Sequence, residues 1–170
     1  MDVIVAGGGT PPALAAQQAT DAIPIVFIGV GDPVGNGLIS SFARPGGNMT
    51  GTTNFAPETA ARRLQLLKEV VPGATRVDAV WNFANPAVAP EWDETQAVAR
   101  QLGVTLQQRD VRDPTQIEGA FQAIAAARPD ALLVGGEPFM VAHRARLVEL
   151  AAAMGLPAMY VDPRFVAAGA

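Results

Sequence analysis

The sequence has no cysteine, a single histidine, His143, and only two serines, Ser40 and Ser41. Without cysteine it has no disulfide framework, no thiolate metal site and no cysteine nucleophile. One histidine cannot supply the ligands of an ordinary zinc site. The adjacent serines are not in a Gly-x-Ser-x-Gly elbow, which would expose a nucleophile. The sequence therefore predicts no metal site and no catalytic triad.

Charged residues are also few. They make up 16% of the 170 residues, with 12 Lys and Arg against 16 Asp and Glu and a net charge of −4. Because a nucleic-acid-binding domain needs a basic surface to hold the phosphate backbone, we expect no nucleic acid partner. No window contains the roughly 18 uncharged apolar residues that a membrane span requires. With 49% apolar residues, the chain has the composition of a globular protein with a buried core.

Short apolar runs alternate with helix-length segments along the chain. The runs are rich in Val, Ile and Leu, which is typical of strands covered on both faces. This alternation predicts an α/β fold with parallel sheets and right-handed crossovers. The predicted strands are residues 3–6, 25–30, 76–81, 105–109, 131–134 and 158–161, and the predicted helices are residues 11–22, 57–71, 90–102, 114–127 and 141–154.

Glycine and proline cluster in one segment, residues 31–54, which interrupts this alternation. A short helix at residues 38–43 and a short strand at residues 49–52 are predicted within it. Two strands and one helix precede the segment, too few to bury their own apolar faces. The sequence therefore predicts two domains, residues 1–53 and residues 54–170, of which the first is part of a larger lobe.

Three consecutive glycines, residues 7–9, lie between a predicted strand and a predicted helix. They offer backbone N–H groups and a helix N-terminus to an anion. No Gly-Lys-Ser/Thr follows, and Pro12 stands where a dinucleotide motif has its third glycine, so we expect no nucleotide cofactor. A tight turn with positive φ, with Thr10 as a helix cap, explains the glycines equally well.

Ligands of open parallel sheets bind beyond the carboxyl ends of the strands. Polar and aromatic residues that follow the predicted strands are therefore the candidate binding residues. Two neighbouring carboxylates among them would suit general acid–base chemistry, but Asp32 could instead cap a turn before Pro33. The predicted ligand-binding residues are Gly8, Gly9, Thr10, Asp32, Asn82, Phe83, Asn85, Glu137 and Asp162.

Several segments with irregularly spaced glycines, prolines and polar residues resemble one known family. The most specific are VGDPVG at residues 30–35 and ARPGGNMTG at residues 43–51. Further matching segments are RLQLLKEVVP at 63–72, WNFANP at 81–86, LGV at 102–104, DALLV at 130–134, AHR at 142–144 and LPA at 156–158. The chain resembles, along essentially its whole length, the ABC-transporter substrate-binding proteins of the group that includes tryptophan and other aromatic amino-acid binders.

The resemblance implies a periplasmic-binding-protein-like fold of type I, in which two parallel, doubly wound Rossmann-like lobes clamp a ligand and deliver it to a membrane permease. Similar proteins are nearly twice as long and begin with a signal sequence, which would lie outside this sequence. Residues 1–53 would then be the C-terminal remnant of lobe one with the crossover, and residues 54–170 would be lobe two without its final return segment. The expected location is periplasmic or otherwise extracytoplasmic.

On this basis we expect a small zwitterion, such as an amino acid, to bind without catalysis. Backbone N–H groups at Gly8, Gly9 and Thr10 are expected to hold its carboxylate. One of the carboxylates of Asp32, Glu137 and Asp162 would hold its amine, and the lobe-two side would be lined by Asn82, Phe83 and Asn85. Rival interpretations are an α/β enzyme with Asp32 and Glu137 as acid and base, and the ligand-sensing domain of a transcription regulator.

Two further expectations concern motion and assembly. Gly47 and Gly51 permit dihedral changes, which favours a hinge at residues 48–53. Residues 3–6 would form a strand with an unpaired edge, and such an edge is a template for pairing with another chain. We therefore expect a homodimer formed through this strand and the helix at residues 11–22.

Overall fold

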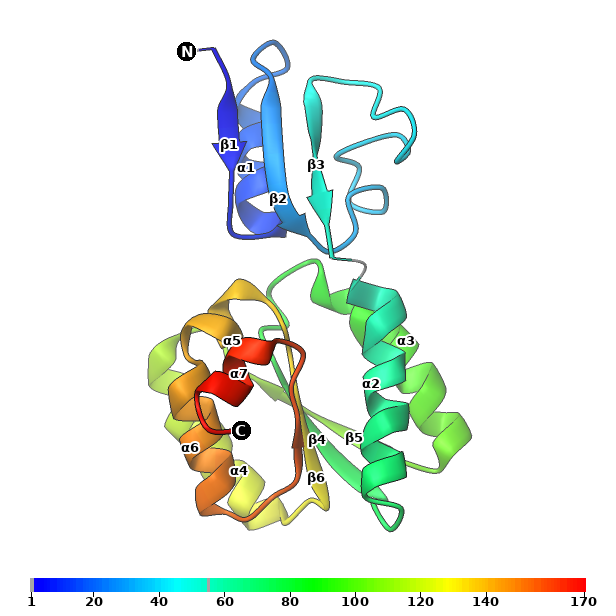
Figure 1. Ribbon diagram of the computed structural model, residues 1–170, viewed down its shortest axis with the longest axis vertical. Helices are drawn as coiled ribbons and strands as arrows, with labels where there is room; N and C mark the ends of the chain where they lie inside the picture. The colour runs from blue at the N-terminus through cyan, green and yellow to red at the C-terminus, as the bar shows by residue number, and fades with distance from the viewer. Residues whose placement is uncertain (1, 55) are drawn as a thin grey trace.

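Two separate parallel β-sheets form the framework of the protein in the computed structural model, which describes residues 2–54 and 56–170 (Figure 1). The first sheet has the strand order β1-β2-β3, and helix α1 packs against it. We call this part of the chain, up to Thr53, lobe one. Its elements are β1 (Ile4–Ala6), α1 (Thr10–Ala19), β2 (Ile25–Val30) and β3 (Met49–Thr53).

The second sheet has the order β5-β4-β6-β7, with all strands parallel, and we call the part built on it lobe two. Its strands are β4 (Arg76–Trp81), β5 (Thr105–Asp110), β6 (Ala131–Val134) and β7 (Ala158–Met159). Its helices are α2 (Ala56–Val70), α3 (Val88–Leu102), α4 (Ile117–Ala127), α5 (Pro138–Ala142), α6 (Arg144–Ala153) and α7 (Pro163–Ala167), and a 3-10 turn, η1 (Pro114–Gln116), leads into α4.

Lobe two has an apolar core on each face of its sheet, because successive side chains of a strand point to opposite faces. Val80 and Leu132 pack with residues of α4, α6 and α7. Ala79 and Leu133 pack with residues of α2 and α3 on the other face. Figure 1 shows these two groups of helices on opposite sides of the sheet. The predicted doubly wound α/β lobe is confirmed.

The predicted strands begin within one residue of the observed ones, but several predicted elements differ in extent or type. The predicted helix at 141–154 is two helices, α5 and α6, because His143 leaves helical geometry with φ −101° and ψ 13°. The predicted strand at 158–161 ends at Met159, since Asp162 already caps α7. Residues 38–43 are not helical. Leu38 and Ile39 instead donate their N–H groups to the Pro33 carbonyl and pack into the core of lobe one.

Gly51 does not act as the predicted hinge. It lies inside β3, paired in register with Phe27 of β2. A Cβ atom at Gly51 would lie 2.0 Å from the Phe27 carbonyl oxygen and 2.4 Å from a ring carbon of the same residue. The glycine is therefore required for close approach of two strands, and its φ is not in the left-handed region. Rotation at this residue would break the β2–β3 pairing.

One face of the lobe-one sheet is apolar and exposed. Val5 and Val26 are neighbours across the β1–β2 ladder, and Ile28 lies on the same face as Val26. Val5 is 63% exposed and Ile28 is 48% exposed. Figure 1 shows α1 on one side of this sheet and no helix on the other side among residues 2–54. Lobe one is thus covered on one face only, unlike lobe two.

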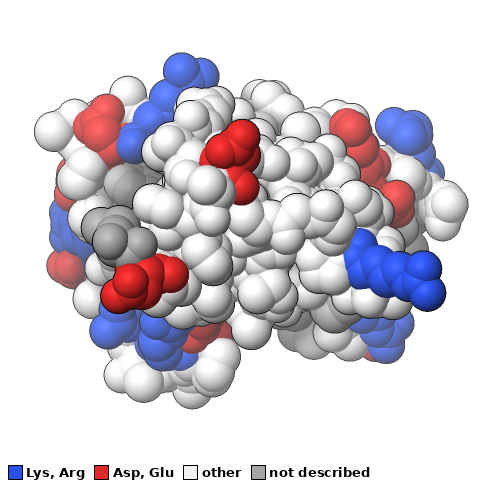
Figure 2. Space-filling view, turned by 90° about the horizontal axis from the view of Figure 1, so that it is seen from above, with Lys and Arg blue, Asp and Glu red and all other residues white. Residues whose placement is uncertain are grey.

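Basic and acidic side chains are interspersed near the rim of the face seen in Figure 2, and no continuous basic area covers that face. Among the described residues, no helix combines the length and the apolar character needed to cross a membrane.

The close approach at Gly51 generates a stability prediction. Gly51→Ala is expected to lower the free energy of unfolding by about 1–3 kcal/mol, because the added methyl group overpacks the strand pair. Gly47→Ala is the matched control, since a Cβ atom there has nothing within 4 Å. It should change stability by less than about 0.5 kcal/mol. Urea unfolding followed by circular dichroism measures the stability of both variants. Equal stabilities of Gly51→Ala and Gly47→Ala would contradict the role of Gly51 in strand packing.

Candidate functional site

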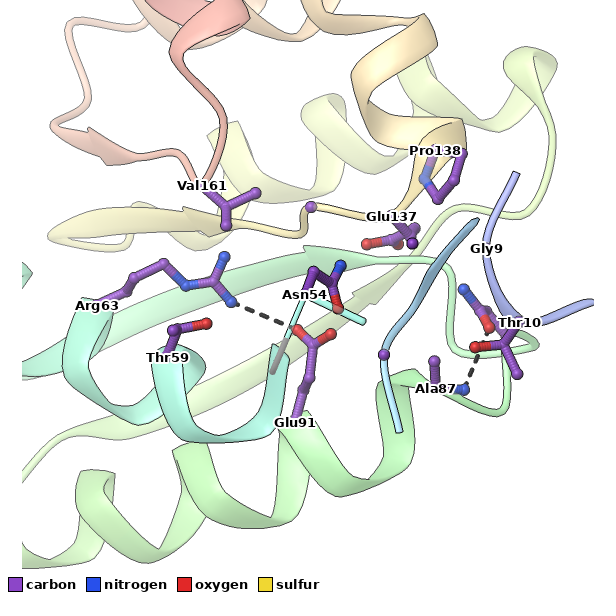
Figure 3. A pocket seen from close by; sticks show the side chains of 14 residues that line it. Gly9, Thr10, Asn54, Thr59, Arg63, Ala87, Glu91, Glu137, Pro138 and Val161 are labelled. Carbon is purple, nitrogen blue, oxygen red and sulfur yellow. Dashed lines mark hydrogen bonds and ion pairs between the residues drawn. The ribbon is translucent and has the colours of Figure 1, made fainter. Parts of the chain in front are cut away.

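The two lobes meet where the carboxyl ends of their strands lie, and a cavity opens between them (Figure 3). Loops that follow β1, β2, β4 and β6 all reach this cavity, as expected for parallel sheets. Lobe one contributes Gly9, Thr10, Gly29 and Gly31 to its lining, and Asn54 follows β3. Lobe two contributes Thr59, Arg63, Asn85, Ala87, Glu91, Gly136, Glu137, Pro138 and Val161.

An adjoining pocket shares part of this lining. Asn85, Glu137 and Pro138 belong to both cavities, so the two form one continuous candidate site at the lobe interface. The other residues of the adjoining pocket are Gly8, Pro11, Asn82, Ala84 and Phe139. Six of the nine predicted binding residues are therefore brought together here, namely Gly8, Gly9, Thr10, Asn82, Asn85 and Glu137.

Glu137 follows β6 and is held in place by the backbone of a neighbouring loop. The N–H group of Asn82 donates to its Oε1 atom over 2.6 Å. A Cβ atom at Gly135 would lie 2.2 Å from Oε2 of Glu137, so the glycine makes room for this carboxyl group. Burial raises the pKa of Glu137 from 4.5 to about 7, although the bond from Asn82 opposes the shift. The side chain therefore titrates near neutral pH.

Arg63 and Glu91 form a buried ion pair beneath the same cavity. Arg63 projects from α2 and Glu91 from α3, with 3.4 Å between Nη2 and Oε2. Burial lowers the pKa of the guanidinium and raises the pKa of the carboxyl group, and in each case the partner's charge offsets only part of the shift. Nε and Nη1 of Arg63 are buried and have no hydrogen-bond partner in the described part of the chain. The attraction within the ion pair thus offsets only part of the cost of burying its two charges.

The glycine loop of lobe one, residues 7–9, agrees only in part with each interpretation of its sequence, an anion site or a tight turn with Thr10 as the helix cap. Gly8 and Gly9 have φ values of 100° and 90°, which a residue with a Cβ atom rarely adopts, so the turn requires glycine. The Gly9 N–H group donates to the Ile28 carbonyl and is not available to a ligand. Gly9 is itself the N-cap of α1, so Thr10 is not the cap. The Thr10 hydroxyl is buried and unpartnered within the described residues.

The predicted asparagines shape the loop after β4. Oδ1 of Asn82 accepts the Ala84 N–H group, and Oδ1 of Asn85 accepts the Ala87 N–H group, each over 3.1 Å. Both bonds are local turns that fix the loop against the cavity. Figure 3 shows Glu137, Asn54 and Thr10 around the same space. The loop is thus held by its own asparagines and by Glu137 and Asp110, which accept the N–H groups of Asn82 and Phe83.

The remaining three predicted residues are engaged elsewhere. Oδ1 of Asp32 accepts the Gly35 N–H group over 2.8 Å, so this carboxylate caps a turn. Asp162 caps α7 and pairs with Arg164, which lowers the pKa of Asp162 to about 2. Phe83 packs edge-to-face against Trp81 and Trp92. Asp32 and Asp162 are therefore not available to hold the amine of a ligand, and Phe83 is not among the residues that line the cavity.

Sequence reasoning missed Arg63 and Glu91 because both lie in helices rather than after strands. Helical periodicity places Arg63 largely off the apolar face of α2, which favours an exposed side chain. Tertiary packing, mainly of α2 against α3, buries it. Across residues 2–54 and 56–170, no group of three or more carboxylate or imidazole side chains is arranged to hold a metal ion.

Two lobes that are each built on a parallel sheet and that enclose a cavity form the architecture of periplasmic-binding-protein-like proteins. The chain belongs to the ABC transporter substrate binding protein family, which it matches over residues 1–170. It is 26% identical to a tyrosine-binding protein of Clostridioides difficile (strain R20291) over 161 residues, 95% of this chain and 46% of the relative. The chain thus spans about half the length of this relative.

Solved structures share the fold. The ABC domain in complex with L-Trp from Streptococcus pneumonia is 23% identical and superposes with a TM-score of 0.88, over 99% of this chain and 56% of that one. The ligand-free, open structure of a substrate-binding protein with adhesive properties from Clostridium difficile is 25% identical, with a TM-score of 0.59 over 93% of this chain and 52% of that one.

The titration of Glu137 predicts a pH-dependent stability. An acid whose pKa is higher in the folded protein stabilises the fold below its unfolded pKa, and this stability is lost as the pH rises through the folded pKa. Between about pH 4.5 and pH 8 the loss is on the order of 3 kcal/mol. Glu137→Gln should remove it and be more stable than the wild type at about pH 8.

Urea unfolding at about pH 5 and pH 8 measures this difference. Glu94→Gln, at an exposed position on α3, is the control and should keep the wild-type pH dependence. If the wild type and Glu137→Gln lost stability equally between the two pH values, the buried carboxyl group would not be the cause.

Proposed function

We propose that the protein is a solute receptor of an ABC transporter that binds a small amino-acid-like ligand in the cavity between its lobes. The observation that carries this proposal is the pairing of buried groups of both charges in one inter-lobe cavity. Arg63 offers unpartnered donors, and Glu137 offers a carboxyl group that titrates near neutral pH. A zwitterion carries the two complementary charges.

The comparisons support this ligand class. The relative is named as a tyrosine-binding protein, and one similar solved structure holds L-Trp.

Family membership also supports a partner and a location. We propose that the protein acts outside the cytoplasm, in the periplasm or its equivalent, and delivers its ligand to a membrane permease. Of the rival interpretations, the ligand-sensing domain of a transcription regulator is disfavoured by the family match.

The proposal includes no catalysis. A pKa near 7 would suit Glu137 as a general acid or base. The second carboxylate that an Asp32–Glu137 pair would need is occupied by the Gly35 N–H group. Glu137 is therefore better explained as a partner for a ligand cation.

Binding is tested with L-tyrosine and L-tryptophan as probes and the 170-residue chain at about pH 8. Saturating ligand, at about 100 times its dissociation constant, should add about 2.7 kcal/mol to the free energy of unfolding. Glu137→Gln should weaken binding by roughly 10-fold to 100-fold, because a charge-assisted hydrogen bond to the ammonium group is lost. Isothermal titration calorimetry measures the affinities, and urea unfolding with and without ligand measures the gain in stability.

The control for this experiment is Glu118→Gln, an exposed glutamate that pairs with Arg146 on the surface of lobe two. It should bind both amino acids as the wild type does. Absence of binding by the wild type, or equal affinity in Glu137→Gln, would contradict the proposed site. Mass spectrometry should recover each ligand unchanged, and a converted product would overturn the non-catalytic function.

We further propose that two copies of the chain associate through strand β1 of lobe one. β1 is an edge strand, and Val5 on it is 63% exposed. A two-fold axis beside β1 would continue the sheet from one copy into the other.

Light scattering of the 170-residue chain is expected to give the mass of a dimer at high micromolar concentration. Val5→Lys should shift the chain to a monomer, because an edge lysine opposes strand pairing. Val70→Lys is the matched control, since Val70 is 75% exposed but lies on lobe two. A monomeric wild type, or a dimer that survives Val5→Lys, would refute this interface.

A further inference from the structure

Arg63 is a buried cation in the lining of the inter-lobe cavity. It is only 7% exposed, and it lines the cavity beside Thr59 and Glu91 (Figure 3). Its single described hydrogen bond is the one from Nη2 to Glu91, over 3.4 Å. Nε and Nη1 have no partner among the described residues.

The geometry of a guanidinium indicates which chemical group would pair with the free N–H donors of Arg63. Its five N–H donors are arranged so that Nη2 shares one edge with Nε and the other edge with Nη1. Glu91 occupies one N–H group of Nη2, and one edge therefore keeps two parallel donors. Two parallel N–H groups match the two oxygens of a carboxylate. A buried guanidinium in this state lacks an anion of that shape.

We propose that Arg63 is the residue that binds the ligand's carboxylate group, through two N–H groups on the edge that Glu91 leaves free. This inference rests on the proposed function and refines it, because it assigns the carboxylate to α2 of lobe two. The glycine loop of lobe one, where the sequence places the carboxylate, has its Gly9 N–H group already bonded to Ile28. Pro11 and Pro12, which follow it, have no N–H group to offer.

The same assignment orders the two charged ends of a ligand. Arg63 and Glu137 both line the cavity but come from different elements, α2 and the loop between β6 and α5. A ligand carboxylate at Arg63 leaves its ammonium group to Glu137 and its side chain to the rest of the cavity. A simple carboxylate such as benzoate would use Arg63 alone.

The test compares L-tyrosine with tyramine, which lacks the carboxylate, in the wild type and in Arg63→Gln. The wild type should bind tyramine at least 10-fold more weakly than L-tyrosine. Arg63→Gln should weaken binding of L-tyrosine at least 10-fold and leave tyramine nearly unchanged, so that the preference for the carboxylate disappears. Arg63→Lys should restore part of the preference, because it keeps the charge but not the planar edge.

Arg62→Gln is the matched control. Arg62 precedes Arg63 on α2 but is exposed and pairs with Glu69 on the surface. It should keep the wild-type ratio of affinities. Benzoate provides a second probe, whose binding should depend on Arg63 and not on Glu137.

Removal of Arg63 leaves Glu91 buried without its cation, which destabilises the single variant. The double variant Arg63→Gln with Glu91→Gln keeps the site neutral, and circular dichroism checks the fold of both. An unchanged ratio of L-tyrosine to tyramine affinity in the folded variant would overturn the role of Arg63 while the proposed function stands. No binding of L-tyrosine, L-tryptophan or benzoate by the wild type would overturn both.

Discussion

The buried guanidinium of Arg63 has more hydrogen-bond donors than the carboxylate of Glu91 accepts. This imbalance leaves unpaired donors at the cavity between the lobes. Arg63 and Glu91 neutralise each other only in part, and burial still disfavours the charged form of each group. Burial likewise disfavours the charged form of Glu137, which lines the same cavity. Water satisfies such groups when lobes are apart, and a closed cavity needs another partner for them.

The fold brings these groups together by the direction of its strands. Parallel strands deliver all their carboxyl ends to one side, so the loops after β1, β4 and β6 carry Thr10, Asn85 and Glu137 to the lobe interface. α2 is the first helix after the crossover, and Arg63 lies about two turns from its start. Two apolar cores hold the lobe-two sheet rigid beneath these side chains.

The sequence predicted the strand–helix alternation and the loops that carry the site, because both follow from local periodicity and chain direction. It offered a turn cap for Asp32, which the bond from the Gly35 N–H group confirms, but it left the state of the other polar groups open. Asp32 and Asp162 follow strands as Glu137 does, but each is occupied by a nearby N–H group or arginine. Arg63 lies at a position that periodicity marks as exposed, and tertiary packing alone buries it. The partners of Asp32 and Asp162 lie two or three residues away, whereas Glu91, the partner of Arg63, lies 28 residues away and leaves no local pattern.

This charge arrangement also explains how a receptor could distinguish its ligand from similar molecules. A zwitterion satisfies Arg63 and Glu137 at once, whereas a molecule with one of the two charges leaves the other buried group without a partner. The penalty for the unpaired group then acts as selection against the wrong ligand. Closure of the lobes is favoured only to the extent that the ligand supplies both charges, because a ligand stabilises a conformation solely by its additional affinity for it. In the proposed function, recognition and closure would therefore depend on the same uncompensated groups.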